Sequence, residues 1–183
     1  MRAVLVPVKS FSRAKLRLAG VLDPDARSRL ARELGARVLR AADGLPRYVV
    51  CDDEEVADWA VAQGARVLWT PGRGLSGAVG AAVRHLGGRG VDLAVVAHAD
   101  LPLVASLGGF GTPGMVTLAP DLRLDGTNVA AVPARSGFRF AYGPGSFQRH
   151  REEAGRLGLS CRVVHDWRLA ADVDHPADLS LLQ

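Results

Sequence analysis

The segment DLAVVAHADLP, residues 92–102, decides the class of fold. Residues 92–98 form an almost continuous apolar run, which is typical of a strand buried on both faces of a sheet. Such strands occur in parallel sheets that helices cover on both sides. Asp100 follows this strand directly, in a turn that Pro102 restrains. The segment therefore predicts a central parallel strand that leads into a carboxylate.

Outward from this segment, strand and helix patterns alternate along the chain. The predicted strands cover residues 2–8, 47–51, 66–69, 92–98, 115–119, 128–132 and 161–165. The predicted helices cover residues 24–42, 53–63, a stretch from the loop at 72–77 to about residue 85, a stretch from the loop at 143–145 to about residue 157, and 176–182. This order predicts one α/β domain, residues 1–183, with three layers and a mostly parallel sheet. Ligands of such sheets bind at the carboxyl ends of the strands.

The composition excludes several classes of protein. Of 183 residues, 48% are hydrophobic and 23% are charged, which is typical of a globular chain. No apolar stretch approaches the roughly 20 residues of a membrane span, and no secretory signal begins the chain, so we expect a cytoplasmic protein without a membrane partner. Cys51 and Cys161 lack the spacing of a zinc site or a disulfide framework. The net charge of +4 comes from scattered residues, which favours a small anionic substrate over a nucleic acid polymer.

The basic residues are distributed unevenly by type. Only Lys9 and Lys15 are lysines among 23 basic residues, and both precede position 16. A preference for arginine codons explains why lysine is rare, but not where the two lysines lie. Because lysine is a compact, mobile point charge, their position predicts a special use in the loop after the first strand.

A glycine-rich loop precedes the third predicted helix. Residues 72–77 read GRGLSG and fit the GxGxxG pattern of dinucleotide-binding proteins, with Asp92 further along as the acidic residue. In that pattern the acidic residue ends the next strand, whereas Asp92 begins one. This mismatch argues against a nicotinamide-dependent oxidoreductase, which remains one alternative. A plain turn and a nucleotide contact of another kind are the others, because backbone N–H groups at a helix start attract phosphate.

Three carboxylates are candidate ligands of a hard cation. Asp100 follows the buried strand, and Asp172 and Asp174 lie two residues apart on extended backbone, so their side chains point the same way. Mg²⁺ prefers carboxylate and phosphate oxygens. The alternatives are that Asp100 is only a turn residue and that Asp174 only caps the last helix.

Two further segments have the composition of an anion site. Residues 142–146 read YGPGS and open a helix, so that flexible backbone, a hydroxyl and a helix N-terminus come together. Ser146 is alternatively a plain N-cap. Residues 125–128 read DGTN and form a turn into a strand. His150 shares the helix face of Ser146 and is either a surface residue or part of the site.

These segments together resemble one family, the 2-phospho-L-lactate and phosphoenolpyruvate guanylyltransferases of coenzyme F420 biosynthesis. The resemblance covers nearly the whole chain. It rests on the segments VPVK at 6–9, AKLRL at 14–18, GLSGA at 74–78, ADLP at 99–102, GTN at 126–128, YGPGSF at 142–147 with His150, and DVD at 172–174 with Asp178 and Leu179. It implies a Rossmann-like nucleotidyltransferase fold.

The resemblance also implies a role for particular residues. Lys15 and Arg17 would lie along the phosphates of GTP, with Lys9 near either phosphate group and Gly74, Leu75 and Ser76 on the nucleotide. Asp100, Asp172 and Asp174 would hold Mg²⁺. Thr127, Gly143 and Ser146 would bind the phosphate of the acceptor acid. The catalytic set would be Lys15, Arg17 and Asp100. The chain departs from the family in having Ser76 where Asn is usual, Asp125 where Gly is usual, and a short segment after Pro102.

The implied reaction transfers GMP from GTP to a small phosphorylated three-carbon acid and releases diphosphate. Its nucleophile is a phosphate whose second pKa is about 6, so no general base is required. What the site must supply is positive charge and position. The arginine-rich composition suggests a bacterium of high GC content, which favours phosphoenolpyruvate as the acceptor. A nucleotidyltransferase of the molybdenum-cofactor type and a non-catalytic nucleotide-binding module are the alternatives.

Overall fold

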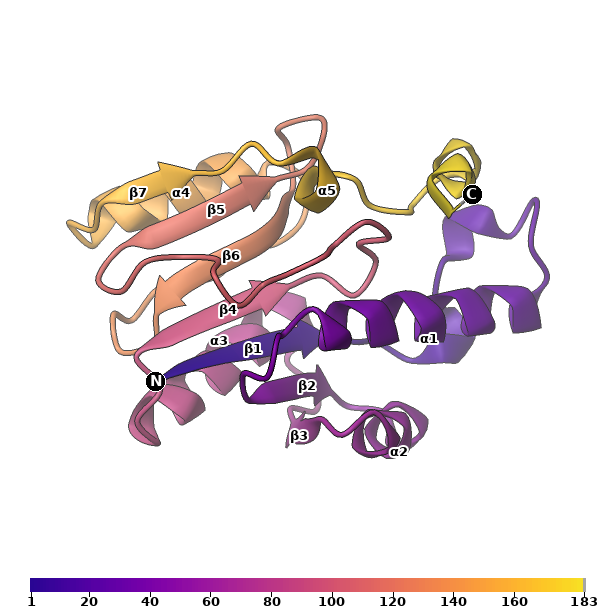
Figure 1. Ribbon diagram of the computed structural model, residues 1–183, viewed down its shortest axis with the longest axis horizontal. Coiled ribbons are helices and arrows are strands. Elements are labelled where there is room, and N and C mark those ends of the chain that lie inside the picture. Colours follow the sequence, from indigo (N-terminus) through magenta and orange to yellow (C-terminus); the bar gives the residue numbers. More distant parts are fainter. Residues whose placement is uncertain (183) are drawn as a thin grey trace.

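The computed structural model describes residues 1–182, and strands and helices alternate along them (Figure 1). The strands are β1 (Arg2–Pro7), β2 (Arg47–Cys51), β3 (Arg66–Trp69), β4 (Leu93–Ala97), β5 (Val116–Pro120), β6 (Thr127–Pro133) and β7 (Cys161–Val163). The α-helices are α1 (Pro24–Arg40), α2 (Glu54–Ala62), α3 (Gly74–Gly88), α4 (Ser146–Arg156) and α5 (Trp167–Ala170). Three short 3₁₀ segments are η1 (Phe11–Arg13), η2 (Leu16–Leu18) and η3 (Pro176–Leu182).

The seven strands form one sheet in the order β3-β2-β1-β4-β6-β5-β7. Neighbouring strands are parallel except at β6, which runs antiparallel to both β4 and β5. The sheet is therefore mostly parallel, as predicted, and β4 lies near its centre with every residue buried. Pro7 ends β1 and does not mark a sheet edge, because β1 pairs with strands on both sides.

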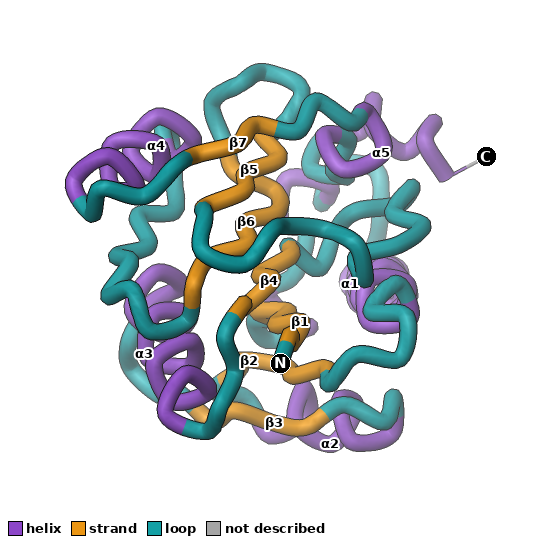
Figure 2. The backbone as a smooth tube through the Cα atoms, turned by 60° about the vertical axis from the view of Figure 1, so that its left-hand side comes forward, coloured by secondary structure: helices purple, strands orange, loops and turns teal. Residues whose placement is uncertain are grey.

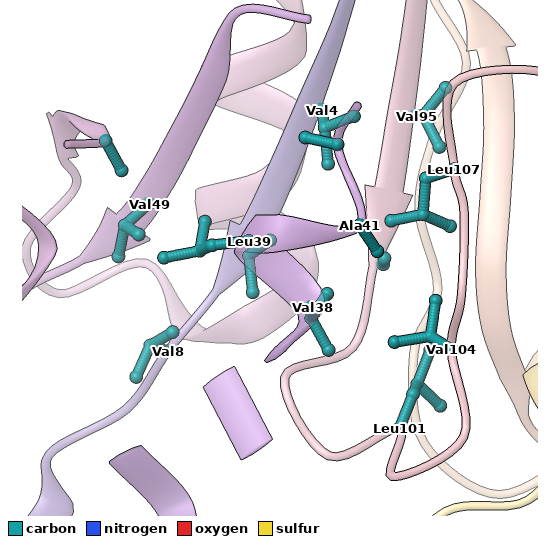
Figure 3. Close-up of a cluster of buried hydrophobic side chains, with 14 of the residues drawn as sticks. Val4, Val8, Val38, Leu39, Ala41, Val49, Val95, Leu101, Val104 and Leu107 are labelled. Carbon is teal, nitrogen blue, oxygen red and sulfur yellow. The ribbon is translucent and has the colours of Figure 1, made fainter. Parts of the chain in front are cut away.

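Helices cover both faces of the sheet, so the predicted three layers are present. Helices α1, α2 and α5 lie on one face, and α3 and α4 on the other (Figure 2). Alternate residues of β1 separate into the two cores: Val4 and Val6 face α1, whereas Ala3 and Leu5 face α3. In Figure 3, Val4, Val38, Leu39 and Leu107 gather between α1 and the sheet.

Most predicted elements lie within a few residues of their observed bounds. Helix α1 begins as predicted, with Pro24 as its first residue and the Asp23 carboxylate accepting a hydrogen bond from the N–H of Ala26. Helix α3 continues three residues beyond the predicted end at 85, and the single turn α5 was not predicted. Within residues 1–182 no helix is long and apolar enough to span a membrane.

The reversed direction of β6 decides which residues meet. A parallel strand would place Thr127 and Asn128 at the amino end of the sheet. Because β6 is antiparallel, both residues begin at the edge where β4 ends, and the His98 N–H donates to the carbonyl of Asn128 (2.9 Å). The turn before β6 thereby joins the loop after β4 at the ligand-binding edge.

Candidate active site

A cleft of about 870 Å³ opens at this edge of the sheet. Its walls are the loop after β1, the loop after β4, the turns that lead into β6 and α4, and the segment before η3. The predicted site residues that line it are Lys9, Lys15, Arg17, Leu75, Asp100, Thr127, Gly143, Ser146, Asp172 and Asp174. Segments that lie far apart in the sequence are therefore brought to one place.

The three predicted carboxylates converge in the cleft. One oxygen from each of Asp100, Asp172 and Asp174 lies within 4.8 Å of the others. The backbone brings them together, because the Val173 N–H donates to the carbonyl of Asp100 (3.1 Å). Asp174 does not cap η3; instead the carboxylate of Asp178 accepts from the N–H groups of Asp174 (2.9 Å) and His175 (2.6 Å). The side chain of Asp174 is thus left to face the cluster.

The carboxylates differ in their electrostatic surroundings. Burial, reinforced by the charges of Asp100 and Asp174, raises the pKa of Asp172 to about 6. Burial also acts to raise the pKa of Asp100, but the charges of Lys15 and His98 outweigh it and hold that pKa below its usual value. The cluster therefore carries an excess of negative charge, which two cationic side chains, Lys15 and Arg17, neutralise only in part.

Of these two cationic side chains, Lys15 lies deeper in the cleft, with 9% of its side chain exposed. Its ammonium donates to Asp100 (2.7 Å), to the carbonyl of Val173 (2.6 Å) and to Asp174 (3.5 Å). Its backbone is left-handed, with φ of 53°, between η1 and η2. This conformation is uncommon for a residue with a side chain and typically occurs at functional sites. Arg17 binds the other oxygen of Asp174 (2.8 Å).

The turn into β6 forms the opposite wall. The carboxylate of Asp121 accepts from the N–H groups of Arg123, Asp125 and Gly126, and so holds the turn closed. Gly126 is required there, since a Cβ atom would lie 2.8 Å from the Asp121 carboxylate. The Asn128 amide donates to the carbonyls of Leu169 and Ala170, which fixes α5 and the chain that continues to Asp172.

The N-terminus of α4 faces the same space. Gly143 and Gly145 have φ of 109° and 72°, values that favour glycine. The helix begins at Ser146, and its N-cap is Gly145, so the interpretation of Ser146 as an N-cap is wrong. The carboxylate of Asp125 accepts from the Gly145 N–H (2.9 Å). This helix end therefore has a carboxylate beside it before any ligand binds.

The glycine-rich loop contributes less to the cleft than predicted. Leu75 lines the cleft, whereas Gly74 and Ser76 are not among its lining residues. The hydroxyl of Ser76 instead accepts from the Tyr142 N–H (2.9 Å) and so connects this loop to the turn before α4. Asp92 lies directly before β4, at the opposite end of this strand from the cleft, so it does not complete a dinucleotide-binding site.

The cleft contains buried polar atoms that the protein leaves unsatisfied. The Asp100 Oδ1, His98 Nε2 and Tyr142 hydroxyl atoms have no hydrogen-bond partner among residues 1–182, and all three residues line the cleft. Since such atoms are costly when unpaired, they indicate a polar ligand. Three converging carboxylates with a free buried oxygen fit a hard divalent cation such as Mg²⁺.

Sequence reasoning missed two cationic residues of the cleft. Arg13 and Arg123 both line it and are exposed. Arg13 lies in the same loop as Lys9 and Lys15, so the cationic composition of that loop could have indicated it. Arg123 follows an aspartate in an ordinary turn, and nothing in that pattern indicates a ligand contact.

The three-layer fold, with this cleft at the carboxyl edge of the sheet, is shared with nucleotidyltransferases of known structure. A nucleotidyl transferase from Methanothermobacter thermautotrophicus superposes with a TM-score of 0.67 over 98% of this chain and 94% of that chain, at 16% identity. This likeness shows that the two chains share a fold. At 16% identity it shows nothing about activity.

The chain itself belongs to the family described as "Guanylyl transferase CofC like", whose model matches residues 1–182. It is similar to a phosphoenolpyruvate guanylyltransferase of Sphaerobacter thermophilus, with 37% identity over 97% of this chain and 90% of the relative. It is also similar to a 2-phospho-L-lactate guanylyltransferase of Halorubrum lacusprofundi, with 38% identity over 98% of this chain and 82% of the relative. The predicted resemblance to the guanylyltransferase family is confirmed. The family match and the two relatives support neither the oxidoreductase nor the molybdenum-cofactor alternative.

Proposed function

We propose that this protein transfers GMP from GTP to a small phosphorylated three-carbon acid, with Mg²⁺, in the cytoplasm and as a step of coenzyme F420 biosynthesis. One observation carries the proposal: a carboxylate cluster, a cationic loop and a glycine-rich helix N-terminus share one cleft. The relatives that carry the names of these enzymes support the reaction class.

The bonds that change are on phosphorus. A phosphate oxygen of the acid attacks the α-phosphorus of GTP, a new P–O–P linkage forms, and the bond to the β-phosphate breaks so that diphosphate leaves. At neutral pH the acid's phosphate is mostly dianionic, so no proton must be removed. What the reaction needs instead is positive charge around the two substrates, and Lys9, Arg13, Lys15, Arg17 and Arg123 line the cleft.

The protein's residues would bring two polyanions together. Lys9, Lys15 and Arg17, on the loop after β1, would hold the phosphates of GTP, and Leu75 would contact the nucleoside. Thr127, Gly143 and Ser146 would bind the phosphate of the acid at the N-terminus of α4. Asp100, Asp172 and Asp174 would hold Mg²⁺, which neutralises phosphate charge. Catalysis would then rest on position and electrostatics.

Phosphoenolpyruvate is the acceptor that we favour, because of the arginine-rich composition. Relatives of both names match at 37% and 38% identity, so the assay must compare both acids. Purified protein is incubated with GTP, Mg²⁺ and each acid, and diphosphate is measured. We expect release with at least one acid and faster release with phosphoenolpyruvate. Absence of diphosphate with both acids would refute the proposal.

The role of Asp100 can be tested separately. Asp100→Asn keeps the shape of the side chain but removes its charge, so we expect turnover to be abolished while the fold is retained. Asp58→Asn, at an exposed position of α2, is the matched control and should leave turnover unchanged. Near-normal turnover in Asp100→Asn would remove this residue from the proposed metal set.

A further inference from the structure

His150 is completely buried, although it lies on a helix that borders the cleft. Rings of three aromatic residues surround it, with centroid distances of 5.7 Å to Phe138, 5.9 Å to Phe140 and 5.1 Å to Tyr142. The interpretation of His150 as a surface residue is therefore wrong. Both ring nitrogens nevertheless have polar partners, which gives the imidazole a defined orientation.

The partners of the ring fix its tautomer. The backbone N–H of Ala141 lies 2.9 Å from Nε2. A backbone amide nitrogen can only donate, so Nε2 must accept and cannot carry a proton. Burial, with the charge of Arg149 as a second cause, lowers the pKa of His150 to about 4, which agrees with a neutral ring at neutral pH. The single ring proton is then on Nδ1.

The tautomer in turn fixes the hydroxyl of Thr127. The Nδ1 atom lies 3.0 Å from the Thr127 hydroxyl oxygen. Because Nδ1 carries the proton, it donates and the hydroxyl oxygen accepts. The hydroxyl's own proton must then point elsewhere, and among residues 1–182 this hydroxyl makes no hydrogen bond besides the one to His150. Thr127 lines the cleft, so an acceptor in the cleft is the natural partner.

We propose that His150 is a positioning residue that sets the Thr127 hydroxyl as a hydrogen-bond donor to the phosphate of the acceptor acid. The proposal rests on the proposed function, since it assigns the group that this donor meets. A phosphate dianion only accepts hydrogen bonds, so the direction of the Thr127 hydroxyl matters. With the opposite tautomer, Thr127 would donate to the ring and present lone pairs to the anion, which repels it.

Two variants separate this role from simple packing. An asparagine amide reaches the position of Nδ1, so His150→Asn keeps a donor to Thr127 and loses the acceptor for Ala141. A glutamine amide reaches the position of Nε2, so His150→Gln keeps the acceptor for Ala141 and loses the donor to Thr127. Both variants remove the aromatic ring, so each serves as the packing control for the other.

We expect the KM for the acid to rise roughly 10- to 100-fold in His150→Gln, because one hydrogen bond to a charged group is lost. In His150→Asn it should stay within about threefold of the wild type, and the KM for GTP should change little in both. Equal losses in the two variants, or a loss confined to the KM for GTP, would overturn the proposal.

The tautomer can be measured without any variant or turnover. Long-range ¹H–¹⁵N correlation spectra of the wild-type protein distinguish a proton on Nδ1 from one on Nε2. A proton on Nδ1 supports the proposal, and a proton on Nε2 overturns it even if the variants are unfolded. If the protein releases no diphosphate but His150 has the expected tautomer, the proposed function fails alone. A binding titration with phosphoenolpyruvate then compares His150→Gln with His150→Asn: weaker binding in His150→Gln supports the proposal, and equal binding overturns it.

Discussion

Lys15 combines a left-handed backbone with an ammonium group enclosed by acceptors. An ammonium has three donors that can turn toward three acceptors, here Asp100, Val173 and Asp174. A guanidinium is planar and larger, and its donors are fixed in a fork. The placement of a lysine here in an arginine-rich chain therefore has a physical reason.

We predict that Lys15→Arg lowers kcat/KM roughly tenfold or more, because the fork cannot satisfy the same three acceptors. Steady-state diphosphate release is the measurement. Arg29→Lys, at an exposed position of α1, is the control and should retain full activity. If Lys15→Arg is also fully active, the position of the lysine has no catalytic meaning.

The burial of His150 predicts a dependence of stability on pH. Its pKa is about 4 in the folded protein and about 6.5 in an unfolded chain. Above pH 6.5 the ring is neutral in both states, and its contribution to stability is fully present. Between pH 6.5 and 4 only the unfolded chain binds the proton, so the free energy of unfolding falls by up to about 3 kcal/mol.

Denaturant unfolding of the wild type and of His150→Asn, measured from pH 7 to pH 4.5, checks this contribution. We expect the wild type to lose more stability than the variant as the pH falls. Parallel curves for the two proteins would contradict the expectation.

At the scale of elements, the N-terminus of α4 already has a carboxylate beside it. Asp125 accepts from the Gly145 N–H at the place where an acceptor phosphate is proposed to bind. An asparagine keeps the accepting oxygen and removes the negative charge. We predict that Asp125→Asn lowers the KM for the acid about two- to fivefold, because like charges repel.

The control is Asp125→Ala, which removes the charge and the hydrogen bond together. The start of α4 then keeps only the backbone bond from the Phe147 N–H to the carbonyl of residue 125 and loses the bond from Gly145. We therefore expect a higher KM for the acid than in Asp125→Asn. An unchanged or raised KM in Asp125→Asn would show that this carboxylate does not face the bound phosphate.

Elements with a strong apolar pattern were predictable, and short or non-local features were not. The continuous apolar run of β4 by itself indicates burial on both faces. Asp23 and Pro24, as neighbours in the sequence, are enough to mark the start of α1. The direction of β6 has no local signal, because this antiparallel strand is as buried and apolar as parallel strands of the same sheet. Helix α5 has only four residues, too few for a periodic pattern.

The same reasoning applies to the site. The convergence of Asp172 and Asp174 follows from their spacing, and the position of Asp100 follows from the end of β4. The hydrogen bond from Lys15 to Asp100 joins residues 85 positions apart, and the left-handed backbone of Lys15 is unusual for that residue type. Only the assembled fold shows these two features, or the partners of His150.

At the scale of the whole molecule, a small apolar cluster ties the cationic loop to the C-terminal segment. Leu18, Leu34 and Val173 are buried together, from η2, α1 and the chain between the two aspartates. Val173→Ala should lower the free energy of unfolding by about 2 kcal/mol, because two buried methyl groups are lost. The loop around Lys15 should also be cleaved faster by trypsin.

Chemical denaturation and limited proteolysis measure the two effects. Val132→Ala is the matched control, since Val132 is equally buried but packs on the opposite face of the sheet. We expect a similar loss of stability in this variant without faster cleavage near Lys15. Equal cleavage in both variants would mean that the loop is not held by the C-terminal segment in particular.

The late position of Asp172 and Asp174 in the sequence also bears on synthesis at the ribosome. Every strand of the sheet, including β7, is translated before these two carboxylates. A nascent chain can therefore acquire its hydrophobic layers while the charge cluster is still incomplete. Lys15 is made among the first residues, yet its acceptors at Val173 and Asp174 come only near the end. The framework can thus form before the reactive centre, and the nascent chain cannot complete that centre until these residues are made.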